Sequence, residues 1–110
     1  MSIFEFTKEV IEVCAQSEIV KKVQIIIVEE PVAKLRAEIT DNIFIDIFYN
    51  KETAKKSFSL IKDNKRIYGA DNTKEWHIHP FNNPESHQSS NEIGFVEFIE
   101  KIKDYRYFFS

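Results

Sequence analysis

The stretch Lys34–Tyr49 reads KLRAEITDNIFIDIFY and decides the fold class. In its first half every second residue is apolar: Leu35, Ala37 and Ile39. The second half alternates in the same way: Ile43, Ile45, Ile47 and Tyr49. Alternation with a period of two is the pattern of a β-strand with one buried face. Because only the turn Thr40–Asn42 separates the two halves, the strands are expected to be antiparallel neighbours.

Further short strands and turns flank this stretch, whereas both ends of the chain have helical periodicity. Ser2 and Glu5 have the spacing of a capping box at the start of a first helix. We expect the elements in this order: helix 2–17, strands 22–28, 33–40, 43–49, 55–62 and 65–70, a histidine-rich loop 71–91, and helix 92–104. The predicted fold class is α+β, a single domain over residues 1–110. It is a two-layer sandwich in which the N- and C-terminal helices pack on one face of an antiparallel five-stranded β-meander. The aromatic residues at 105–109 are expected to pack rather than to form a free tail.

Composition excludes several classes of function. The chain has 110 residues, a net charge of −3, a single cysteine and only 2 glycines. An acidic chain is a poor general DNA binder, although a local basic face can still hold RNA. Two glycines leave no glycine-rich phosphate loop. Cys14 lies on the apolar stripe of the first helix, which predicts a buried, unreactive thiol. The longest apolar run, Ile25–Val28, is too short to span a bilayer, and we expect a cytoplasmic protein.

The stretch Ala70–His87, ADNTKEWHIHPFNNPESH, contains all three histidines, the only tryptophan and two of the three prolines. His77 and His79 are two residues apart, so on an extended chain their imidazoles point the same way. His87 follows beyond two prolines that redirect the chain, and can fold back toward that pair. Asp71 adds a carboxylate nearby.

Three interpretations of this segment stay open. In the first, His77, His79 and His87 bind a divalent metal such as zinc and leave a fourth position open. In the second, the histidines act without metal as general acid and base on RNA, and Lys74 stabilises the phosphate charge. In the third, histidine, proline and tryptophan only order a long loop.

The run from Ile43 to His87 resembles the TumE family of toxins from prokaryotic toxin–antitoxin systems. The similarity consists of a β-meander ending in Asp71-Asn72, then clustered histidines, a tract containing Pro80 and Pro84, and a short helix. In this chain, residues 73–76 separate the Asp-Asn pair from the first histidine. The resemblance implies inhibition of growth, an antitoxin partner and an RNA-directed target.

Together these observations predict a TumE-like toxin-module protein with a ribonuclease-type centre in residues 71–87. The predicted catalytic residues are His77, His79, His87 and Asp71, with Asp71 orienting an imidazole. The predicted substrate-binding residues are Asn72, Lys74, Trp76 and Arg66. One alternative is a non-catalytic binding module that forms a homodimer through a free sheet face carrying Phe44 and Phe48. Another is a metal-sensing or storage domain.

Overall fold

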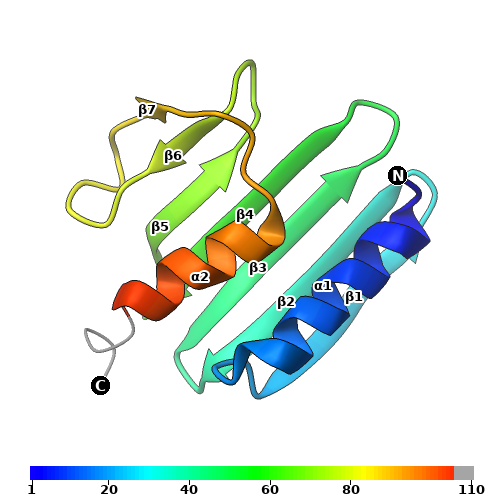
Figure 1. Cartoon of the computed structure of the whole chain (residues 1–110), viewed down its shortest axis with the longest axis horizontal. Coiled ribbons are helices and arrows are strands. Elements are labelled where there is room, and N and C mark those ends of the chain that lie inside the picture. The colour runs from blue at the N-terminus through cyan, green and yellow to red at the C-terminus, as the bar shows by residue number, and fades with distance from the viewer. Residues whose placement is uncertain (106–110) are drawn as a thin grey trace.

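The computed structural model describes residues 1–105 and has two helices and one seven-stranded antiparallel open sheet (Figure 1). The strands follow one another across the sheet in chain order, so each pairs with its sequence neighbours. The elements are α1 (Ile3–Ser17), β1 (Lys22–Glu29), β2 (Val32–Thr40), β3 (Ile43–Asn50), β4 (Lys55–Lys62), β5 (Lys65–Asp71), β6 (His77–His79), β7 (Gln88–Ser89) and α2 (Phe95–Tyr105). The α+β class and the antiparallel meander predicted from the sequence are confirmed. Of the aromatic segment 105–109 expected to pack, residues 106–109 lie outside the described part of the chain.

Helix α1 begins at the predicted capping box. Ser2 Oγ accepts from the Glu5 amide at 3.0 Å, and Glu5 Oε1 accepts from the Ser2 amide at 3.0 Å. Both bonds satisfy amides that the first helical turn leaves without a carbonyl partner. The helix ends where Glu18 adopts a left-handed backbone conformation, with φ of 67°. Cys14 lies in the core as predicted, and burial raises the pKa of its thiol to about 12, which keeps it unreactive.

The core lies between the two helices and one face of the sheet. Helix α1 lies over β1 and β2, and α2 lies beside it on the same face (Figure 1). Leu35 of β2 is opposite Ile47 of β3, and both are fully buried. Phe58 of β4 packs against α2, with its ring 5.4 Å from that of Phe95 and 5.5 Å from that of Phe98. Each helix thus buries its apolar stripe on the side that the alternation predicts.

The expected five-stranded sheet and the loop 71–91 are wrong in one respect. The chain turns after β5 and returns along it as β6, and β7 then pairs with β6. These strands are only three and two residues long, and such short segments carry no detectable alternation. Helix α2 begins at Phe95 rather than at 92, because Glu97 Oε1 accepts from the Gly94 amide and caps the helix there.

Within residues 1–105, both helices lie on one face of the sheet, and the other face carries none. Phe44 and Phe48 lie on it, half-buried. The guanidinium of Arg36 lies 4.0 Å above the centre of the Phe44 ring and pairs with Asp46 at 3.1 Å. This face, here called the open face, is therefore partly covered by its own side chains. Among residues 1–105, no helix has the length and apolar character needed to cross a bilayer.

Candidate functional site

The pairing of β5 with β6 places the candidate residues on the open face. Asp71 is directly opposite His77, and Gly69 is opposite His79. Cross-strand partners point to the same face. Asp71 is also opposite Ser57 on β4, and Ser57 is opposite Phe48 on β3. The two histidines and the carboxylate therefore lie on the face that the helices leave uncovered.

The ring of His79 lies against Gly69, which has no side chain to occupy that space. A Cβ at this position would lie 3.1 Å from Arg66 Cδ, 3.3 Å from the Phe58 carbonyl oxygen and 3.5 Å from His79 Cδ2. A methyl group here would be in ordinary contact with the ring, and its tight contacts would be with Arg66 Cδ and the Phe58 carbonyl oxygen. Sequence reasoning missed Gly69, since an isolated glycine in a strand indicates a close approach without naming the approaching group.

Three imidazoles meet at this point, as the histidine cluster in the sequence predicted. The ring centre of His77 lies 4.9 Å from that of His79, and the ring centre of His87 lies 4.8 Å from His77 and 4.7 Å from His79. Their nearest ring nitrogens all lie within 4.8 Å of one another. His87 returns because two turns fold the intervening segment: Pro80 accepts from the Asn83 amide, and Asn83 accepts from the Ser86 amide. His79 is 3% exposed, whereas His87 is exposed at the rim.

Backbone carbonyls determine the tautomer of two of these rings. His77 Nδ1 lies 2.9 Å from the Glu75 carbonyl oxygen, and His79 Nδ1 lies 3.2 Å from the Pro84 carbonyl oxygen. A carbonyl oxygen only accepts, so each Nδ1 carries a proton and donates it. In the neutral ring, Nε2 then presents a lone pair. Both Nε2 atoms are thus prepared to bind a cation or a proton.

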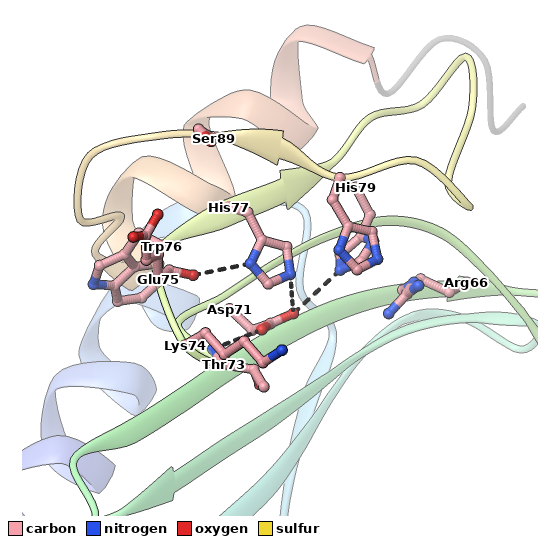
Figure 2. A pocket seen from close by; sticks show the side chains of 10 residues that line it. Arg66, Asp71, Thr73, Lys74, Glu75, Trp76, His77, His79 and Ser89 are labelled. Carbon is pink, nitrogen blue, oxygen red and sulfur yellow. Dashed lines mark hydrogen bonds and ion pairs between the residues drawn. The ribbon is translucent and has the colours of Figure 1, made fainter.

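Both Nε2 atoms point at the same carboxylate oxygen. Asp71 Oδ2 lies 3.3 Å from His77 Nε2 and 3.2 Å from His79 Nε2, as the dashed lines in Figure 2 show. A carboxylate oxygen only accepts, so each Nε2 reaches Oδ2 either by donating a proton to it or by sharing a bound cation with it. In a tetrahedral zinc site with bonds of about 2.0 Å, neighbouring ligand atoms are about 3.3 Å apart. The two distances from Asp71 Oδ2 to the histidine nitrogens match that spacing.

Asp71 is held in its charged form. Burial acts to raise the pKa of its carboxyl, but hydrogen bonds from Thr73 and His79 and the nearby His77 outweigh that effect and lower the pKa. The Thr73 amide donates to Asp71 Oδ1 at 2.9 Å, which leaves Oδ2 for the histidines. The two carboxylate oxygens have separate tasks: one fixes the side chain, and the other faces the imidazoles.

A cavity of about 630 Å³ opens over this cluster. Arg66, Lys74 and Trp76, three of the predicted substrate-binding residues, line it together with the histidines and Asp71 (Figure 2). Asn72, the fourth, is not among its lining residues. Its side chain instead accepts from the Lys56 amide at 2.8 Å and donates to the Ala54 carbonyl at 2.9 Å. These bonds tie the end of β5 to the start of β4 and so steady the neighbouring Asp71.

No family model, no curated protein and no solved structure matches this chain.

Proposed function

We propose that this protein is a toxin-module ribonuclease that works with a divalent transition-metal ion, held by Asp71, His77 and His79. One observation carries the proposal: two imidazoles with their Nδ1 protons bonded to backbone carbonyls direct both Nε2 atoms at one oxygen of Asp71. A cation bound there satisfies all three donors at once. The resemblance of residues 43–87 to TumE toxins supports RNA as the target.

The donor set favours zinc among the common metals. Two imidazoles and a carboxylate suit zinc, and catalytic zinc sites keep three protein ligands with one further position open. Metal-binding histidines in proteins usually donate their second nitrogen to a carbonyl or carboxylate, as His77 and His79 do here. His87, more exposed than either, is the residue at the open side of the site.

The cavity supplies groups that RNA cleavage needs. Arg66 and Lys74 are exposed cations on its lining, suited to a phosphate, and Trp76 offers a ring on which a base can stack. A bound cation would polarise the phosphate. Attack by the ribose 2′-oxygen forms one P–O bond and breaks the bond to the 5′-oxygen. One proton passes from the 2′-hydroxyl to the leaving oxygen, and His87 is placed to move it.

Metal binding is the first test. Protein purified without a histidine tag is loaded with zinc, dialysed and assayed by elemental analysis, and titrated with zinc by calorimetry. We expect about one ion per chain, and an affinity at least about tenfold weaker in Asp71→Asn and His77→Ala. Lys55→Ala, an exposed substitution away from the cavity, is the matched control. Absence of stoichiometric binding to the folded wild-type chain contradicts the metal centre.

RNA cleavage is the second test. Total RNA incubated with the protein should give fragments ending in 2′,3′-cyclic phosphate, a chelator should stop the reaction, and zinc should restore it. Expression in a bacterial host should arrest growth, and His77→Ala should relieve the arrest. If cleavage persists in the chelator, the reaction does not need the metal, and the same histidines would act as general acid and base without it. Intact RNA together with stoichiometric metal would leave the metal-sensing or storage domain, which the same donor set also favours.

A further inference from the structure

The two edges of the sheet differ in length and in character. At one edge β7 has only two residues, whereas at the other edge β1 has eight (Figure 1). Strand β1 leaves three consecutive isoleucines in contact with solvent: Ile25 at 53%, Ile26 at 40% and Ile27 at 45% exposed. An edge strand also presents unpaired backbone amides and carbonyls. A long apolar edge of this kind is a template for another strand.

A β-bulge in β1 determines which partner fits this edge. Ile25 is opposite Leu35 and Ile27 is opposite Lys34, so Ile26 is an extra residue. Before the bulge, odd-numbered residues such as Val23 share the helix-covered face with their partners on β2. After it, even-numbered residues do, and Val28 is opposite the buried Ala33. At the bulge, in the middle of the strand, the residues that face the helices thus change from odd-numbered to even-numbered.

That reversal makes the edge self-complementary. A two-fold axis perpendicular to the sheet keeps every side chain on its own face and pairs two copies of β1 antiparallel. With the axis between Ile25 and Ile26, Val23 lies opposite Val28 of the second copy, and both are on the helix-covered face. Gln24 lies opposite Ile27, and both are on the open face. Registers one residue away would oppose side chains from different faces across the bulge.

We infer that β1 is a homodimer interface, in which the two sheets join into one across this two-fold axis. The charges at the strand ends agree with this register, because Lys22 of each copy lies opposite Glu29 of the other copy. The dimer therefore contains this pair of opposite charges at both ends of the paired strands. Both residues are exposed, both lie on the open face, and neither is in an ion pair within residues 1–105. Opposite charges directly across a strand pair stabilise the pair.

The helices fit the same arrangement. Helix α1 lies over β1 and β2 in each chain (Figure 1). Because the axis keeps both copies on one face, it brings the two α1 helices to the same side of the joined sheet, near the interface. Phe4 and Ile11 lie seven residues apart on one flank of α1 and are 65% and 39% exposed. They offer apolar surface for a contact between helices that the isolated chain leaves in water. The interface is formed by the end of the sheet away from the histidines, so the inference stands independently of the proposed function.

Charge exchange tests the interface and its register together. Sedimentation equilibrium of the full chain should give twice the mass of one chain. Lys22→Glu or Glu29→Lys alone should raise the dimer dissociation constant about tenfold, because each places like charges opposite one another at both strand ends. Mixing the two variants should restore the dimer, since the mixed pair again sets opposite charges together at both ends. The double variant Lys22→Glu, Glu29→Lys should dimerise like the wild type.

Two further variants complete the experiment. Ile26→Lys, at the centre of the edge, should give monomers that keep the far-ultraviolet circular dichroism of the wild type. Val96→Lys, at a position 49% exposed on α2, is the matched control and should leave the dimer intact. A wild-type chain that stays monomeric at high concentration overturns the inference. A dimer that Ile26→Lys and the single charge reversals leave unchanged overturns it as well, and directs attention to the open face.

Discussion

The body of the sheet and its histidine end are held together by different means. Strands β2 to β4 are long, and most of the side chains they turn toward the helices are apolar, buried and paired across the strands, as at Leu35 and Ile47. At the histidine end, β6 and β7 are short, and a polar residue, His79, is 97% buried. Its hydrogen bonds to Asp71 and Pro84 offset the cost of that burial. One region therefore supplies stability, and the other positions chemical groups.

The largest expected effect is a loss of folding stability from a core substitution in β4 that leaves the histidine site unchanged. Leu60→Ala removes a fully buried side chain from β4 and should lower the free energy of unfolding by about 2–5 kcal/mol. Urea unfolding followed by circular dichroism measures the loss. Zinc affinity of the folded variant should stay at the wild-type value, because the donors lie on the other face. A parallel loss of affinity in the folded chain would mean that the two regions are not separate.

A smaller effect should come from Gly69→Ala, which acts on the site through packing. The added methyl group meets a backbone oxygen at 3.3 Å and the His79 ring at 3.5 Å, so we expect a loss of about 1–3 kcal/mol and a weaker zinc site. Gly94→Ala is the matched control, since its Cβ meets only Glu97 Oε1 at 3.6 Å. Urea unfolding and zinc titration measure both quantities. Equal behaviour of the two glycine variants would show that His79 has room to move aside.

The smallest expected effect is a loss of folding stability at low pH that depends on the Asp71 carboxylate. The pKa of Asp71 is lower in the folded protein than its ordinary value of 3.8, so the charged carboxylate stabilises the folded state. That contribution is complete above the ordinary value and is lost as the pH falls through the lower pKa of the folded state. Metal-free wild-type protein should therefore lose its stability advantage over Asp71→Asn as the pH falls below about 4. Urea midpoints measured from pH 7 to pH 3 check this, and an advantage that grows in acid would contradict it.

Much of the fold could be predicted because its signals are local. Alternation over Lys34–Tyr49 identified two central strands, and the capping box at Ser2 located the first helix to within one residue. The two histidines of the His-Ile-His motif were expected on one face, and they are. Strands β6 and β7 were missed, because strands of three and two residues form only when a neighbouring edge is already in place.

The site itself shows the limit of such signals. The sequence assigned Asp71 to orient one imidazole, whereas its Oδ2 faces both His77 and His79, a relation that depends on the pairing of β5 with β6. The roles of Gly69 and of the Asn72 side chain also had no local signal. Each depends on atoms supplied by another strand.

The secondary structure of the meander and the grouping of three histidines in one segment can be read from the chain alone, because side-chain periodicity and turn chemistry act over a few residues. The contact of three rings with a carboxylate, and the bulge in β1 that makes its edge match itself, become visible only in the folded chain. Both outcomes depend on the register between strands. Register is a property of pairs of segments, set when the shared apolar face is buried, and no single segment contains it.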